Sequence, residues 1–238
     1  MSESNFPPEP LGGRKFDSDT IFPWASRVAP FAVFIGFLAA QPYLDRVFDP
    51  RWVVVTRGLA VAAVLALLWR NYVELHREQL RAATSDWLLA VAVGVGVFFF
   101  WIEFSAGWST FGEAPAGFVP LHADGSVDAL LVGLRLFGLA LAVPVMEELF
   151  WRSFLMRRID SAEFLHFDPR RTSLLAIALS SALFALEHSQ WFAGLIAGAG
   201  YAWLYMRSRS LLIPIVSHAT TNAILGTWIL ATGSWTFW

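Results

Sequence analysis

The chain has 238 residues, a formal net charge of −2 and no cysteine. Hydrophobic residues make up 56% of it and charged residues 15%, whereas soluble globular domains carry about 25% charged residues. This excludes an ordinary soluble domain, disulfide bonds and cysteine-based chemistry, and gives no indication of nucleic-acid binding. At ~20 apolar residues per span, we expect an all-α, polytopic transmembrane helix bundle with about seven spans, within a range of roughly six to eight.

The N-terminal region divides into a polar tail and a first apolar run. Residues 1–20 are polar and rich in proline and glycine, which predicts a disordered cytoplasmic tail. The run 24–44 that follows is predicted to be the first span. A cleaved signal peptide is the alternative, but the tail is long and mixed in charge and the run exceeds a usual signal core.

The rest of the chain supplies the other predicted spans and shows no internal repeat. Residues 21–238 are therefore expected to form a single transmembrane helical domain. Pro144 should kink its span, as membrane helices tolerate. The remaining predicted spans cover 52–69, 86–104, 128–156, 172–188, 190–206 and 211–231.

Arginine and lysine predict how the bundle is oriented in the membrane. Positive residues stay cytoplasmic, and most of the 17 fall in segments that seven spans would place on one side. The N-terminus is therefore expected inside and the C-terminus outside. The residues on the predicted cytoplasmic side are Arg14, Lys15, Arg27, Arg70, Arg77, Arg81, Arg157, Arg158, Arg170, Arg171, Arg207 and Arg209.

One predicted span, 128–156, contains three charged residues. Each such group costs roughly 2.5–3.5 kcal/mol at a helix centre, so Glu147, Glu148 and Arg152 must face a protein or water-filled interior. Glu148 and Arg152 are four residues apart and share a helical face, whereas Glu147 is rotated by about 100°. One carboxylate can pair with the arginine and the other can act on water. The alternative is an ion-pair cluster that only locks helices together.

Two later spans add further polar groups. Phe184 and His188 share a face near the end of 172–188, where a lone histidine can also be an interfacial residue. Glu187 beside it is interpreted as a rim charge. His218 and Asn222 share a face in 211–231, where they can also join helices by hydrogen bonds worth ~0.6–2 kcal/mol. Three helices thus supply polar groups to one interior.

These groups occur as Glu-Glu-x-x-x-Arg at 147–152, Phe-x-x-x-His at 184–188 and His-x-x-x-Asn at 218–222. Over 128–230 the pattern resembles the CAAX-protease and bacteriocin-processing family of intramembrane proteases. Trp151 and the chain length are similar to the bacterial subgroup associated with exosortase sorting systems. The resemblance implies an integral protein of the bacterial inner membrane that cuts a membrane-associated peptide or protein, lipidated in some relatives, near its terminus.

The resemblance also implies roles for the motif residues. Glu147 with His188 would activate water, Glu148 and Arg152 would orient Glu147, and His218 and Asn222 would stabilise the oxyanion. We expect no cofactor. The alternative chemistry is zinc held by Glu147, His188 and His218, because two histidines and a glutamate make a valid catalytic set.

The predicted depths of these residues disagree. Counted from the arginine clusters, Glu147 lies ~15 Å deep, His218 ~10 Å and His188 ~25 Å. We expect the fifth helix to begin outside the membrane, near Asp168 and Pro169. Two other functions remain open: a non-catalytic scaffold or immunity protein of the same fold, and a proton-coupled transporter, for which the expected inverted repeats are not found.

Overall fold

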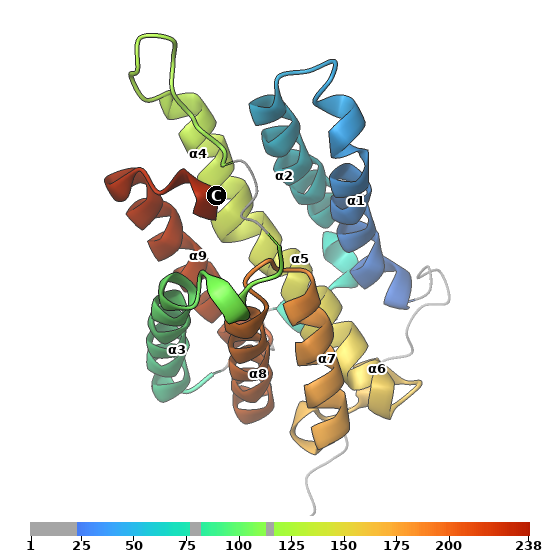
Figure 1. Ribbon diagram of the computed structural model, residues 1–238. Helices are drawn as coiled ribbons and strands as arrows, with labels where there is room; N and C mark the ends of the chain where they lie inside the picture. The colour runs from blue at the N-terminus through green and yellow to red at the C-terminus, as the bar shows by residue number, and fades with distance from the viewer. Residues whose placement is uncertain (1–22, 77–81, 113–116) are drawn as a thin grey trace, which may run out of the picture.

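The computed structural model describes residues 23–76, 82–112 and 117–238. The predicted tail at 1–20 and the residues Arg77 and Arg81 lie outside these ranges. Within them the fold is helical, and the only β pairing is an isolated bridge between Leu121 and Val127. This confirms the predicted all-α bundle (Figure 1).

Seven helical segments occupy the seven predicted positions. The fourth is one long helix that changes between α and π geometry, in the order α4 Ala129–Phe137, η5 Gly138–Ala142, α5 Val143–Glu148, η6 Leu149–Met156 and α6 Arg157–Asp160. The others are α1 Pro23–Leu44, α2 Pro50–Leu67, α3 Thr84–Glu103, α7 Leu174–Leu186, α8 Trp191–Ser208 and α9 Leu212–Thr232.

Short 3₁₀ turns occupy connections between these helices and the segment that follows α9. They are η1 Trp69–Asn71, η2 Val73–Leu75, η4 Gly107–Ser109, η7 Phe164–His166, η8 Pro169–Arg171 and η9 Trp235–Phe237.

In the described part of the chain, four segments are long and apolar enough to cross a membrane: α1, α2, α3 and the α4–α6 helix. α7 has only 13 residues and a length of ~20 Å, so it cannot cross a hydrocarbon core of ~30 Å by itself. The helix lies at the predicted position but is shorter than the span predicted at 172–188. α9 has 21 residues, but its hydropathy is reduced by the polar groups that it carries inward.

Large apolar side chains cover the outside of the bundle. Leu67 is 83% exposed, Leu88 69% and Leu174 85%. A soluble monomer rarely exposes apolar surface this widely, so these side chains fit contact with lipid. The chain is an integral membrane protein.

Close approaches between helices depend on small residues. A Cβ on Gly94 of α3 would collide with the carbonyl oxygen of Ser217 in α9. Gly198 of α8 lies against Ser181 of α7 in the same way. Small residues at such contacts let membrane helices approach closely, and here they bring α9 and α8 up to their neighbours.

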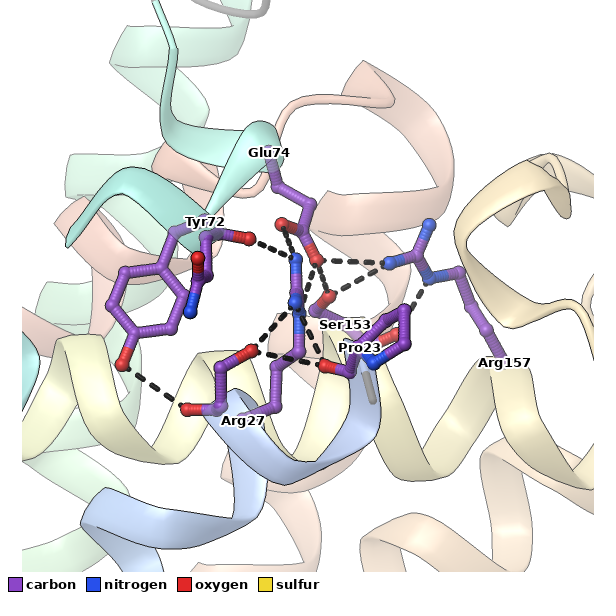
Figure 2. Close-up of polar contacts among 8 residues, drawn as sticks. Pro23, Arg27, Tyr72, Glu74, Ser153 and Arg157 are labelled. Carbon is purple, nitrogen blue, oxygen red and sulfur yellow. Dashed lines mark hydrogen bonds and ion pairs between the residues drawn. The ribbon is translucent and has the colours of Figure 1, made fainter. Parts of the chain in front are cut away.

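A buried ion cluster fixes α1 to the long helix at the arginine-rich end of the bundle, the end that carries Arg27, Arg157 and Arg207. Figure 2 shows Glu74 of η2 between two arginines. Arg27 donates to it at 2.5 and 3.1 Å and Arg157 at 3.3 Å, while Ser153 donates from the π segment. The cluster joins three segments that lie far apart in the sequence.

Candidate active site

The long helix places Glu147 and Glu148 at the junction between α5 and the π segment η6. Single π turns inside α-helices are frequent at functional sites because they rotate side chains out of the regular pattern. Both carboxylates are buried, with Glu148 fully enclosed and Glu147 5% exposed.

Glu148 and Arg152 pair as their spacing predicts. Arg152 Nε lies 3.2 Å from Glu148 Oε2, and both side chains are almost completely buried. The guanidinium also lies over the rings of Phe184 and Tyr201, with its central carbon 4.4 and 5.4 Å from their centroids. Arg152 thus neutralises Glu148 and packs the long helix against α7 and α8.

His218 of α9 joins this pair, which the sequence did not predict. Its Nδ1 lies 3.0 Å from Glu148 Oε1, and its ring stacks on Tyr201 with centroids 4.9 Å apart. The other ring nitrogen, Nε2, faces Glu147 Oε2 at 3.9 Å. Glu147 Oε2 is buried and has no hydrogen-bond partner among the described residues. One carboxylate oxygen therefore remains free to act on a bound molecule.

His188 lies just beyond the C-terminal end of α7. Its Nδ1 is 2.9 Å from the Phe184 carbonyl oxygen, and its ring packs edge-on against Trp101 of α3. Phe184 connects it to the rest of the cluster, because its ring centroid is 4.7 Å from that of His188 and 6.1 Å from that of His218. The structure therefore gathers all three motifs around Phe184.

Glu147 and His188 lie at similar depths when the long helix and α7 are both measured from a contact that they share. Asp160 at the end of α6 accepts from the backbone nitrogen and hydroxyl of Ser173, each at 2.7 Å, so α6 ends where α7 begins. From that level Glu147 lies ~20 Å away and His188 ~22 Å. The Asp168–Pro169 start signal is present, but it begins the short turn η8, and Ser173 caps α7 itself.

Asn222 takes a position of its own, one turn beyond His218. Its Nδ2 donates to the Leu139 carbonyl oxygen at 2.8 Å. In a π turn that carbonyl would accept from residue 144, which is proline and has no N–H. Asn222 therefore satisfies a carbonyl that Pro144 leaves unpaired and fixes α9 against the long helix.

Glu187 and Trp151 form a contact that the sequence interpretation missed. Trp151 Nε1 donates to Glu187 Oε2 at 3.0 Å, joining the first motif to the residue before His188. Glu187 is exposed, which agrees with the rim position expected for it. The tryptophan three residues after Glu148 was the one signal for this pairing.

Zinc is the metal that the motif residues could be expected to hold. In the described part of the chain, no group of three His, Asp or Glu side chains is arranged to bind a metal ion. The Nδ1 atom of each site histidine is held by Glu148 or by the Phe184 carbonyl, the kind of outer contact that a metal-binding histidine makes, and Nε2 stays open. As placed, the candidate ligands among the described residues do not come together as a three-residue zinc site.

The comparisons with known proteins agree with the motif residues. A family model described as type II CAAX prenyl endopeptidase Rce1-like matches residues 129–224, which run from α4 into α9 and include every motif residue. No curated protein and no solved structure matches the chain.

Proposed function

We propose that this chain is an intramembrane endopeptidase of the CAAX-protease family, and that it hydrolyses a peptide bond with water activated by Glu147. The observation that carries this proposal is the free oxygen of Glu147. It is a buried carboxylate oxygen that has no hydrogen-bond partner among the described residues and lies 3.9 Å from His218 Nε2. That distance is too long for a direct hydrogen bond and leaves both atoms available to one water molecule.

The proposed reaction begins with proton transfer from that water to Glu147. The water attacks the carbonyl carbon of the scissile bond and forms a tetrahedral oxyanion, and Glu147 then passes the proton to the leaving amine. His188 assists at the water. No step requires a metal ion.

His218 and Glu148 stabilise the charge that develops. Glu148 accepts from His218 Nδ1, which fixes the ring so that Nε2 faces Glu147. A protonated Nε2 can donate to the oxyanion while Glu148 balances the imidazolium charge. Arg152 pairs with Glu148 and holds it in place, and Asn222 holds α9 at the level where His218 reaches the site.

The proposed substrate is a membrane-associated peptide or protein that is cut near one terminus. The site lies ~20 Å along the long helix from its end at Asp160, and apolar side chains cover the bundle around it. A substrate must therefore approach within the membrane, which favours a segment that is apolar or carries a lipid. The exosortase-associated subgroup and the bacterial inner membrane remain proposals on the motif resemblance.

The test compares membrane peptides from cells that carry the wild type, Glu147→Gln or Glu163→Gln. Glu163 is exposed in the connection after α6 and serves as a matched control. We expect at least one membrane peptide to keep its uncut terminus in Glu147→Gln cells alone. If no terminus changes and the variant keeps its biological role, the chain is a non-catalytic scaffold or immunity protein of the same fold.

A further inference from the structure

Two arginines lie within helices near the end of the bundle where α2 and α4 begin, opposite the arginine-rich end. They take no part in the proposed hydrolysis. Arg57 lies in α2 and Arg135 in α4, which pack side by side with their first residues at the same end (Figure 1). A Cβ on Gly58 would lie 3.2 Å from the Cα of Gly138, so the two backbones meet one residue beyond Arg57. The two guanidinium groups interact electrostatically.

This α2–α4 arginine pair lacks the carboxylate partners that other arginines have. In the described ranges neither Arg57 nor Arg135 forms an ion pair. Arg57 is 8% exposed, and Arg135 Nε is buried without a hydrogen-bond partner. The arginines that do pair with carboxylates are Arg27, Arg51, Arg152, Arg157, Arg207 and Arg209.

Among the described residues, the charges that act on this pair leave an excess of one positive charge. Asp45, in the connection between α1 and α2, is the carboxylate that acts on Arg57 electrostatically, but it does not contact it. Asp45 Oδ1 is itself buried without a hydrogen-bond partner. Two arginines against one aspartate thus leave room for one anion, and a guanidinium without an anion is costly inside a membrane.

Both side chains reach toward the end of the bundle where α2 and α4 begin. Arg57 Nη1 donates to Gln41 Oε1 at 3.1 Å, close to the C-terminal end of α1. Arg135 lies over Phe118, in the connection that precedes α4. Their Cα atoms lie ~9–10 Å below the first residues of their helices. Long basic side chains at this depth extend to the headgroup level of a bilayer.

From this geometry we propose that Arg57 and Arg135 bind the phosphate of an anionic phospholipid at this end of the bundle. Guanidinium groups bind phosphate oxygens through paired, charge-assisted hydrogen bonds. The carboxylate of a peptide held at the active site is a poorer candidate. Arg135 precedes Glu147 by twelve residues, or ~18 Å of helix, which an extended peptide needs about five residues to cover.

The test measures lipid affinity of the purified full-length protein in detergent. Its thermal unfolding midpoint is titrated with phosphatidylglycerol, with phosphatidylcholine and with inorganic phosphate. A ligand that binds only the folded state raises the midpoint according to its affinity. We expect phosphatidylglycerol to bind the wild type more tightly than either of the other two.

Three variants identify the binding groups. The double variant Arg57→Gln with Arg135→Gln should lose about tenfold or more in phosphatidylglycerol affinity, as expected for charge-assisted hydrogen bonds. Arg46→Gln, which changes an exposed arginine in the α1–α2 connection, should bind as the wild type does. Asp45→Asn removes the competing carboxylate, keeps both arginines and should bind more tightly.

Several results would overturn the proposal. If the double variant binds phosphatidylglycerol as tightly as the wild type, the two arginines do not bind this lipid. If the variant also has a raised KM for peptide cleavage, the two arginines bind the peptide substrate instead. An equal response to inorganic phosphate would assign the site to free phosphate. Weaker phosphatidylglycerol binding by Asp45→Asn would contradict the charge argument, even if the double variant does not fold.

Discussion

His218 Nδ1 lies 3.0 Å from Glu148 Oε1, although the two residues are 70 positions apart in the sequence. This contact makes the two adjacent glutamates unequal. Glu148 is held by Arg152 at 3.2 Å and by His218, whereas Glu147 Oε2 has only the longer contact with His218 Nε2, at 3.9 Å, among the described residues. Glu148 is therefore the structural member of the pair, and Glu147 is the member proposed to act on water.

Removing Arg152 should destabilise the bundle strongly. Arg152→Met leaves Glu148 buried without its cation, and breaking a buried ion pair in this way costs about 3–5 kcal/mol. Arg158 is exposed one turn and a half further along, so Arg158→Met should change the stability by less than about 0.5 kcal/mol. Thermal or detergent-induced unfolding measures both. Equal stability of the two variants would contradict the role given to Arg152.

Gly94 should be needed for the position of α9. Gly94→Ala places a methyl group against the Ser217 carbonyl oxygen, next to His218, and overpacking of this kind costs about 1–3 kcal/mol. The variant should unfold at a lower temperature and cleave more slowly. Gly96 in the same helix has nothing within 4 Å of its added Cβ, so Gly96→Ala is the control and should be tolerated. Similar losses in both variants would contradict the packing argument.

The Glu74 cluster should make the stability of the protein depend on pH under acidic conditions. Burial alone would raise the pKa of Glu74, but the charges and hydrogen bonds of Arg27, Arg157 and Ser153 outweigh it and lower the pKa below 4.5. A carboxyl with a lowered folded pKa stabilises the protein above its unfolded pKa and loses that contribution as pH falls through the folded value.

Glu74→Gln removes this titration. The unfolding midpoint of the wild type should exceed that of the variant at neutral pH, and the difference should shrink as pH falls below about 4.5. Unfolding curves of both proteins across pH 3–7 provide the check. A difference that stays constant over this range would show that the carboxylate charge contributes nothing.

Proteolysis should not depend on a metal ion. Treating the purified protein with a tight chelator should leave the rate of cleavage unchanged, because the proposed reaction activates the water with Glu147 and His188 and stabilises the oxyanion with His218. Complete loss of cleavage that Zn²⁺ restores would instead support the zinc alternative, with Glu147, His188 and His218 as ligands.

Hydropathy and motif spacing predicted the seven helices and the pairing of Glu148 with Arg152, because both depend on residues close together in the chain. They could not predict contacts made by packing. The Glu148–His218 contact, the Trp151–Glu187 hydrogen bond and the Glu74 cluster each join segments whose relative position no local pattern specifies.

The sequence interpretation missed two local features. The helix expected to begin near Asp168 and Pro169 begins only after Ser173, because residues 169–171 form the turn η8. The role of Asn222 toward Leu139 depends on a π turn, and Pro144 alone did not indicate that geometry.

The role of Glu147 is tested most directly by the cleavage rate and the unfolding midpoint of the purified Glu147→Gln variant. The substrate is a peptide that stays uncut in cells that carry this variant. Glu147→Gln should be as stable as the wild type and should cleave at least ~100-fold more slowly, as expected when a general base is removed. Glu148→Gln should instead unfold at a lower temperature. Cleavage by Glu147→Gln at the wild-type rate would contradict the assignment of Glu147 as the base.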